Sequence, residues 1–436
     1  MRPERPRPSV SSKPRTSSQT APVPERAGKP LPAFPVYALW FLMTWEVDQY
    51  LSATIHGPFY RAPMLLVPVL FVALLSRGSK RALYWPLVVF VLLHLGAALF
   101  SVNAGLARDA FKYMLYVLVL FGCTVCFLDT PAKISVVLKL YLAHFIWFGI
   151  QGIPSGRVGW HPLLANEDSY GPLMVMAMGF AYFYGMATAS RRWRRIAQIA
   201  FFLGMLGLVV SFARGAAIAG AATLLFILVR SPQRMKTIIT LVVLVIVLVP
   251  VAAMFVSIDE YIAEIQSSSE GDDGRIAVWT LAWNVFKTSP VFGVGAFNFG
   301  PVASEITLPD EKRAKGADPA QLWNAWVHNA PMQILAEEGL IGIGVWIVMV
   351  LGFFRRNAHL RREDAKARWA SWGGEVLDVR MISLGLDAAM IGWIGCSLFY
   401  NQIYLHWFWS LITLSYALAL VVDRAPEGPR EKAPAK

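Results

Sequence analysis

Residues 238–255 read IITLVVLVIVLVPVAAMF, a run without a single charged residue. A helix needs about 20 mainly apolar residues to cross the hydrocarbon core of a bilayer. A transmembrane β-strand would be shorter and would alternate apolar with polar side chains. Only helices and closed barrels satisfy all their backbone hydrogen bonds in lipid. The run therefore predicts a membrane-spanning helix.

Similar runs recur through the chain, which has 436 residues, 56 % of them hydrophobic and 16 % charged. This composition is too apolar for a soluble enzyme of that length. The sequence predicts an all-α integral membrane protein with about 12 transmembrane helices. Apolar length and charged breaks place them near residues 34–55, 62–76, 83–100, 110–128, 134–153, 171–189, 196–212, 215–230, 236–257, 331–354, 380–397 and 402–422.

The predicted order of segments follows from these spans. Residues 1–33 are rich in Pro, Arg and Ser without an apolar core, which is typical of a disordered tail and not of a signal peptide. Residues 34–257 hold helices 1–9 and residues 258–330 form a large loop with active-site segments between helices 9 and 10. Residues 331–422 hold helices 10–12, and residues 423–436 form a second tail.

Basic residues predict the orientation. Twelve spans put 29 of the 40 Lys and Arg residues on the cytoplasmic side, together with both termini. The separation of the seventh and eighth spans at residues 213–214 is needed for this asymmetry, and it directs Arg214 outward. The loops at 154–170 and 257–330 are then extracytoplasmic. The net charge of +12 is thus a topology signal and does not indicate nucleic acid.

Arg214 lies in the sequence SFARG, between two apolar runs. A guanidinium at such a position is costly unless it meets a partner, water or an anionic substrate. It marks either a functional site or an arginine whose head reaches the membrane interface.

A second arginine, Arg275, lies in GRIAVW at 274–279, ahead of SPVFGVGAF at 289–297. Its rigid five-donor fork suits phosphate oxygens, so two outward arginines suit a diphosphate. The glycines of 293–300 fit neither a dinucleotide fingerprint nor a phosphate loop and are interpreted as turn glycines.

His328, in WVHNAP at 326–331, stands just outside a predicted span. A neutral imidazole there could accept a proton from a sugar hydroxyl, although a lone histidine is more often structural. No ligand spacing predicts a metal site. Cys123 and Cys126, inside an apolar run, are predicted to be buried thiols.

The chain resembles the O-antigen ligase and polymerase superfamily in three motifs that follow one another in order. They are SFARG, then GRIAVW with PVFGVG, and then HN followed by EGLIG at 338–342. The loop with Arg157 and Asn166 resembles the family's preceding outer loop, although its usual Pro-Asn pair is Ala165-Asn166 here. The family often has Ser where Ala213 stands.

The resemblance implies a glycosyltransferase, without metal or other cofactor, at the periplasmic face of the bacterial inner membrane. Its partners would be an undecaprenyl-diphosphate-linked glycan donor, a lipid A-core or growing-glycan acceptor, and membrane lipids. Arg214 and Arg275 would bind the diphosphate and His328 would be the catalytic base. Arg157, Asn329 and Glu338 would support them.

Three functions stay open at this point. The favoured one is an O-antigen ligase acting by a single, inverting displacement. A polymerase of O-antigen or exopolysaccharide would use the same chemistry. A polysaccharide or lipid transporter is the third, but the sequence shows neither repeated halves nor the chain of acids that proton coupling requires.

Overall fold

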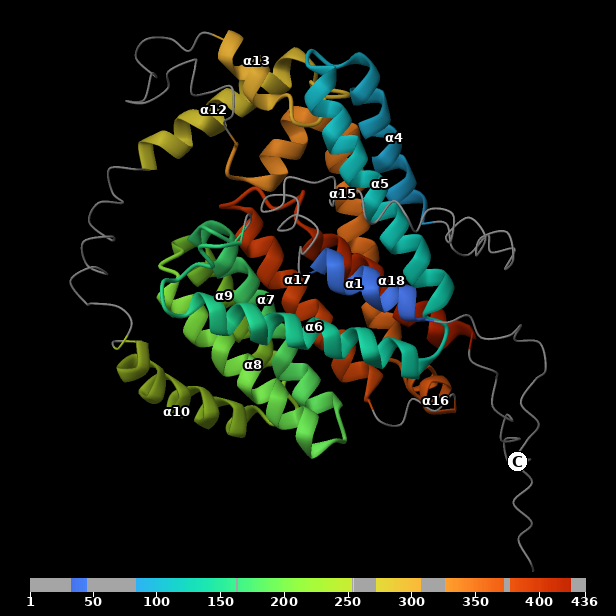
Figure 1. The fold of residues 1–436 in the computed structure, drawn as a ribbon, viewed down its shortest axis with the longest axis vertical. Helices are drawn as coiled ribbons and strands as arrows, with labels where there is room; N and C mark the ends of the chain where they lie inside the picture. Colours follow the sequence, from blue (N-terminus) through green and yellow to red (C-terminus); the bar gives the residue numbers. More distant parts are fainter. Residues whose placement is uncertain are drawn as a thin grey trace, which may run out of the picture. The chain divides into compact units, whose positions relative to one another are not determined.

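The computed structural model describes residues 33–44, 84–161, 164–252, 254, 272–306, 326–371 and 377–424. Within these ranges the regular structure is α-helical, apart from one isolated bridge between Thr188 and Leu377 (Figure 1). The predicted span at 62–76 and nearly all of both predicted tails lie outside the described residues.

Eleven predicted spans coincide wholly or partly with helices of the structure. These are α1 (Phe34–Thr44), α4 (Trp85–Phe100), α5 (Ala104–Phe127), α6 (Pro131–Gly152), α7 (Glu167–Ala187), α8 (Arg191–Val210), α9 (Arg214–Arg230), α10 (Arg234–Ala252), α15 (Ala330–Leu360), α17 (Val379–Ser397) and α18 (His406–Arg424).

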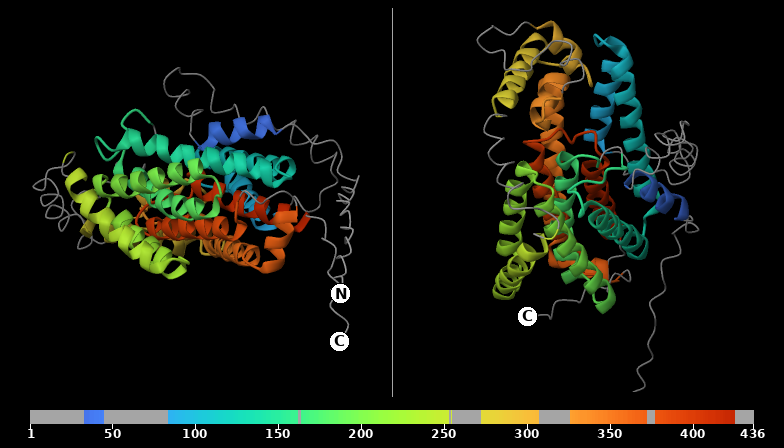
Figure 2. Two further views of the ribbon diagram at one scale, coloured as in Figure 1. Left: turned by 90° about the horizontal axis from the view of Figure 1, so that it is seen from below. Right: turned by 60° about the vertical axis from the view of Figure 1, so that its left-hand side comes forward.

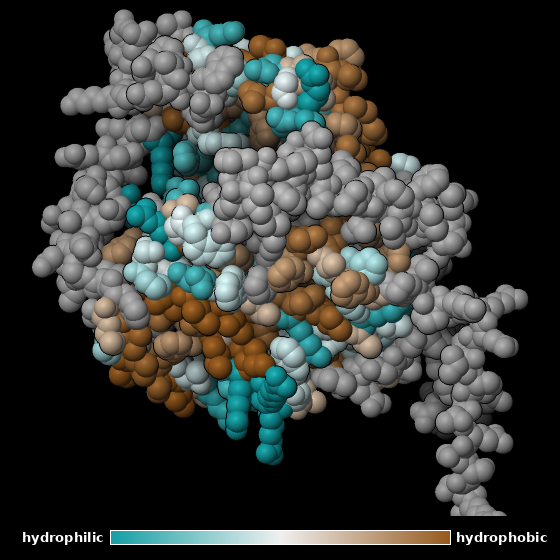
Figure 3. All heavy atoms as spheres, in the orientation of Figure 1, coloured by the Kyte–Doolittle hydropathy of each residue, from teal (hydrophilic) through white to brown (hydrophobic). Residues whose placement is uncertain are grey.

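Six of these helices, α5, α6, α8, α15, α17 and α18, are long and apolar enough to cross a bilayer. An all-α protein with several membrane-spanning helices is therefore confirmed, while the number twelve stays a prediction. The outer surface agrees, because Leu99, Leu225 and Ile246 are each more than 60 % exposed. Figure 3 shows hydrophobic side chains across the lower half of one face, with hydrophilic ones at its lower edge. Such a surface suits contact with lipid.

A break between two helices lies where the sequence divides the seventh and eighth predicted spans. Helix α8 ends at Val210 and α9 begins at Arg214, with a short turn between them. Both helices pack against α7, and α7 packs closely on α17. Gly179 allows that approach, since a Cβ there would lie only 2.8 Å from the backbone of Ala388. Small residues at helix contacts are typical of membrane bundles.

At each end of α7, segments that are predicted to lie on the same side of the membrane contact each other. At its C-terminal end, Asp378 N–H donates to Ala187 O at 2.8 Å, joining a loop predicted as cytoplasmic to the predicted cytoplasmic end of the sixth span. At its N-terminal end, Gln402 Nε2 donates to Asp168 O at 3.2 Å, joining the predicted outer end of the last span to a loop predicted as outward-facing. The contacts therefore agree with the predicted grouping of the loops.

In the described parts of the long predicted loop, residues 272–306 and 326–330, two helices precede α15: α12 (Asp272–Thr288) and α13 (Phe299–Glu305). They pack on each other and on the N-terminal part of α15 (Figures 1 and 2). Leu281, Val285, Val302, Val327 and Ala336 contribute to a small core between them. This part of the chain is thus a packed cap on α15.

Helix α15 is interrupted at Gly339, whose φ of 65° and ψ of −161° are not helical. The interruption frees backbone groups, and residues 290–295 satisfy them. Val294 N–H donates to Ala336 O at 3.1 Å, and Leu340 N–H donates to Pro290 O at 2.9 Å. A broken membrane helix is stable only where its free backbone groups find such partners.

The C-terminal part of α15 runs beyond the predicted end at residue 354 to Leu360, and α16 (Glu363–Ser371) follows. Arginines are good helix formers, so charge alone does not end a helix. Arg356 also lies over the rings of Tyr84 and Tyr416, with its guanidinium carbon 4.8 and 5.2 Å from the ring centroids. The predicted loop at 355–380 is therefore largely helical.

Candidate functional site

His328 immediately precedes α15 and has a left-handed backbone, with φ of 53°. This conformation costs a residue other than glycine of the order of 1–3 kcal/mol, so its surroundings must hold it. Asn329 contributes directly. Its Oδ1 accepts from Met332 N–H and its Nδ2 donates to Leu398 O, both at 2.9 Å. Asn329 therefore caps α15 and ties its start to the segment after α17.

Arg275, in the first turn of α12, is brought close to His328. Burial and the positive charge of Arg275 both lower the pKa of His328. One turn further along α12, Trp279 Nε1 donates to Val327 O at 3.1 Å. The motif tryptophan thus attaches α12 to the residue before the histidine. Two of the three principal predicted residues therefore share one site.

Arg214 is the first residue of α9, and its side chain is exposed. The next residue, Gly215, is covered by Phe399, whose side chain leaves no room for a Cβ. Tyr400, beside Phe399, is buried, and its pKa is raised first by burial and then by Asp168. The charge of Arg275 and the backbone N–H of Gly215 oppose that shift.

Tyr400 therefore joins two parts of the site, the start of α9 and Arg275 on α12. Sequence reasoning missed it. The tyrosine lies in FYNQIY at 399–404, partly inside the predicted last span. Its neighbours Asn401 and Gln402 were the available signal, because two adjacent amides indicate a break between helices.

Arg157 lies in the loop between α6 and α7, and its side chain is exposed. Gly156 has a φ of 66° and packs against Val210 O, so the loop lies over the turn between α8 and α9. Asn166, from the same loop, accepts from Ser169 N–H at 3.0 Å and caps α7. Asn166 thus has a structural role, whereas Arg157 lies near the turn that precedes Arg214.

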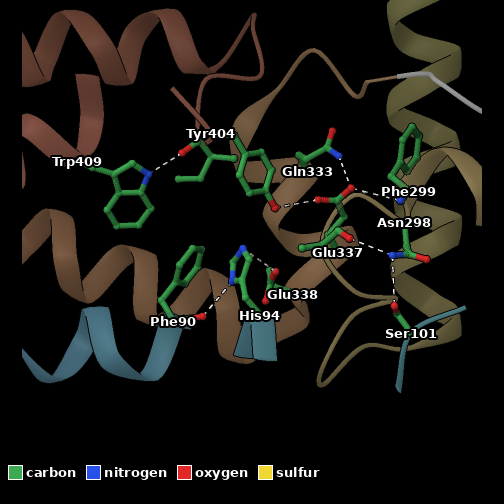
Figure 4. Close-up of polar contacts among 12 residues, drawn as sticks. Phe90, His94, Ser101, Asn298, Phe299, Gln333, Glu337, Glu338, Tyr404 and Trp409 are labelled. Atoms are coloured by element: carbon green, nitrogen blue, oxygen red, sulfur yellow. Dashed lines mark hydrogen bonds and ion pairs between the residues drawn. The ribbon is translucent and has the colours of Figure 1, made fainter. Parts of the chain in front are cut away.

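Glu338 occupies a different environment. Its Oε1 lies 3.5 Å from His94 Nε2 on α4, and both side chains are buried (Figure 4). His94 Nδ1 lies 2.9 Å from Phe90 O, which can only accept, so Nδ1 carries a hydrogen. Among the described contacts, none joins Glu338 to His328 or to the two arginines. Any contribution of Glu338 to the site is therefore indirect.

The neighbouring Glu337 is better connected to the site, and sequence reasoning missed it. Its Oε1 accepts from Gln333 Nε2 at 2.6 Å and from Phe299 N–H at 3.2 Å, and its Oε2 accepts from Tyr404 Oη at 3.3 Å (Figure 4). Adjacent acids inside a predicted span were a signal, because ionisable groups there are rare and paired.

Backbone strain coincides with the three motifs. Phe212, Phe297 and His328 are the residues other than glycine with positive φ in the described ranges, at 54°, 60° and 53°. Each lies in one of the motif segments that contain or flank Arg214, Arg275 and His328. Residues held in such conformations cluster at functional sites. Gly293 and Gly295 also have positive φ, as turn glycines do, and Gly293 packs on the backbone of Glu337.

These features define a class of protein: a polytopic α-helical membrane protein in which Arg275, on α12, lies close enough to His328, just before α15, to lower its pKa. Residues 199–347 match the family described as O-antigen ligase. The match confirms the resemblance carried by the motifs and places this segment in the O-antigen ligase superfamily. It includes Arg214, Arg275, His328 and Glu338. No curated protein matches the chain at a significant level.

Proposed function

We propose that the chain is an O-antigen ligase. It transfers a preassembled glycan from undecaprenyl diphosphate to a hydroxyl of a lipid A-core acceptor, at the periplasmic face of the inner membrane. The observation that carries the proposal is the pairing of Arg275 with His328 inside the segment that matches the family.

The arginines suit the leaving group. As the glycan departs, negative charge develops on the diphosphate, and fixed guanidinium groups stabilise that charge with charge-assisted hydrogen bonds. Arg275 carries this role from α12, and Arg214 carries it from the start of α9, where the helix dipole adds positive potential. Arg157, on the loop over the same turn, adds a further positive charge.

His328 suits the role of base. Its lowered pKa keeps the imidazole unprotonated at neutral pH, ready to accept the proton of the acceptor hydroxyl. The hydroxyl oxygen then forms a bond to the anomeric carbon while the bond from that carbon to the diphosphate oxygen breaks. The electron pair of the broken bond leaves with the diphosphate. One displacement of this kind inverts the anomeric configuration.

A strain that lacks the chain tests the proposal in cells. A ligase predicts that full-length glycan accumulates on its lipid carrier while lipid A-core stays unsubstituted. Plasmid-borne wild type should restore attachment, whereas His328→Ala and Arg275→Ala should not. Arg234→Ala is the matched control and should restore attachment. Arg234 is an exposed arginine at the start of α10, and its guanidinium donates to Val229 O near the end of α9.

The same experiment separates the polymerase. If the strain instead loses long lipid-linked glycan, the chain joins repeat units and the acceptor is a growing glycan. If attachment and glycan length are both unchanged, neither transfer reaction is supported.

A further inference from the structure

We propose that Gln333 and Glu337 are positioning residues for His328: a hydrogen-bonded clamp that runs from the Glu337 carboxylate through the Gln333 amide to the backbone of Val327, the residue before the histidine. The inference rests on the proposed function, in which His328 is the base. It concerns residues that touch neither donor nor acceptor in that function.

The backbone of Val327, the residue before His328, is held on both sides. Val327 N–H donates to Gln333 Oε1 at 2.9 Å, and Val327 O accepts from Trp279 Nε1 at 3.1 Å. Val327 itself is fully buried. Both backbone polar groups of this residue are therefore bound by side chains, which fixes the two peptide groups on either side of Val327, the second of which leads into His328.

The Gln333 amide is oriented by Glu337. Its Nε2 donates to Glu337 Oε1 at 2.6 Å, which leaves its Oε1 directed at Val327 N–H (Figure 4). Both side chains are 1 % exposed, so water does not compete for these bonds. A flipped amide would face the carboxylate with its oxygen and Val327 N–H with its nitrogen, losing both bonds. The geometry admits one orientation.

Glu337 is in turn fixed by two other segments. Its Oε1 also accepts from Phe299 N–H at the start of α13, and its Oε2 accepts from Tyr404 Oη. The carboxylate thus receives hydrogen bonds from three parts of the chain and is locked in place. Buried polar networks whose members are all satisfied rigidify their surroundings.

The clamp stabilises the left-handed backbone of His328, which is unfavourable by itself. Without it, the segment can relax towards commoner conformations and carry the imidazole away from the acceptor. A displacement of about 1 Å can lower a rate about 100-fold. Because Gln333 does not contact the donor, the loss should appear in kcat and leave the donor KM nearly unchanged.

Three variants of the full-length purified protein test the clamp. Gln333→Leu removes both hydrogen bonds at similar volume, and we expect kcat to fall about 10- to 100-fold. Gln333→Glu places two carboxylates side by side, and its kcat should fall by a similar factor. The double variant Gln333→Glu/Glu337→Gln restores a donor between the two positions and an acceptor for Val327 N–H, so it should recover most of the lost activity.

Asn357→Leu is the matched control. It removes another buried amide, one that donates to Asp387 Oδ1 and accepts from Ser415 Oγ at the far end of α15. It should lower the melting temperature without changing the kcat of the folded protein. If Gln333→Leu behaves like this control, Gln333 is merely structural and the proposal is overturned.

Hydrogen exchange gives a readout that does not depend on turnover. Amides of residues 326–333 should exchange faster in Gln333→Leu and Gln333→Glu than in wild type, and the double variant should restore protection. Unchanged exchange in the single variants overturns the clamp. Protected wild type that transfers no glycan would instead contradict the proposed function while leaving the clamp intact.

Discussion

Burial lowers the pKa of the His328 imidazole, and the positive charge of the Arg275 guanidinium lowers it further. The positive charge opposes a second positive charge nearby, and burial disfavours the charged form further. The arginine therefore has two uses in the proposed reaction. It stabilises the leaving diphosphate and it keeps the base unprotonated.

The pH profile tests the second use. Because the pKa of His328 is lowered, the rate of transfer by wild type should fall only at a pH below the ordinary value of about 6.5. Arg275→Gln removes the charge, so the acid limb of its residual activity should move to higher pH. Arg275→Lys keeps the charge and should leave the limb in place. Profiles of kcat/KM for the three proteins give the measurement, and identical acid limbs in wild type and Arg275→Gln would contradict the coupling.

Arg214→Lys tests the geometry of the first use. Lysine keeps the charge but loses the planar fork that binds two phosphate oxygens together. We expect kcat/KM to fall about 10-fold or more, in line with the loss of a charge-assisted hydrogen bond of about 1.5–3 kcal/mol. Arg234→Lys, remote from this turn, should be neutral. Equal activity of wild type and Arg214→Lys would show that charge alone suffices.

At this scale the sequence singled out charged residues for a physical reason. Arg214 and His328 stand out because ionisable groups are rare beside apolar runs. Tyr400 and Gln333 could not be predicted, since neutral side chains near span ends are common. Their importance depends on contacts with segments far away in the chain.

At the scale of elements, the interruption of α15 organises the site. Gly339 lies in a backbone region that is essentially restricted to glycine, and residues 290–295 bind the freed backbone groups. The first part of α15 thereby holds Glu337 against the start of α13, and Gln333 against Val327, which Trp279 of α12 also binds. Apolar length predicted the helix itself, but a glycine within a helical pattern is usually tolerated, so the interruption was not predictable.

Gly339→Ala tests the interruption. Its Cβ would overlap Val291 O, and its backbone would be strained, so we expect a loss of about 3 kcal/mol in the free energy of unfolding. Gly344→Ala, on the same helix with nothing within 4 Å of its Cβ position, is the control and should be neutral or slightly stabilising. Thermal unfolding in detergent compares them, and equal melting temperatures would contradict the account of α15.

The opposite end of α15 is fastened by a buried charge. Asp387 Oδ2 lies 2.6 Å from Arg361 Nη1, and its Oδ1 accepts from Asn357 Nδ2 at 2.7 Å. Asp387→Ala leaves the arginine without its partner and should destabilise the protein by about 3 kcal/mol, at the lower end for buried pairs because Arg361 is partly exposed. The kcat of the folded variant should be unchanged. A fall in kcat at unchanged melting temperature would assign Asp387 a role in the reaction.

At the scale of the whole molecule, two contacts each join segments that the sequence assigns to the same side of the membrane. The contact between Ala187 and Asp378 and that between Asp168 and Gln402 lie at opposite ends of α7. Charge asymmetry predicted this grouping because basic loops are retained in the cytoplasm. The packing of residues 272–306 on α15 was not predictable, since it depends on tertiary contacts within a segment of mixed composition.

Cysteine labelling tests the orientation. The three native cysteines are buried, so an added exposed cysteine should dominate the reaction with a membrane-impermeant maleimide. In intact spheroplasts, Ser155→Cys should be labelled, whereas Ala189→Cys should react only after the membrane is permeabilised. The reverse pattern would place the candidate site in the cytoplasm.

Reconstituted transfer tests the central claim, that Arg275 and His328 act together on a lipid diphosphate and a sugar hydroxyl. Purified wild type, His328→Ala, Arg275→Ala and Asn357→Leu would be incubated with undecaprenyl-diphosphate glycan and lipid A-core in proteoliposomes, and the attached glycan followed by mass spectrometry. The account predicts transfer by wild type and by Asn357→Leu, with losses of about 100-fold or more in the other two. Folded His328→Ala and Arg275→Ala that transfer glycan as fast as wild type would contradict it.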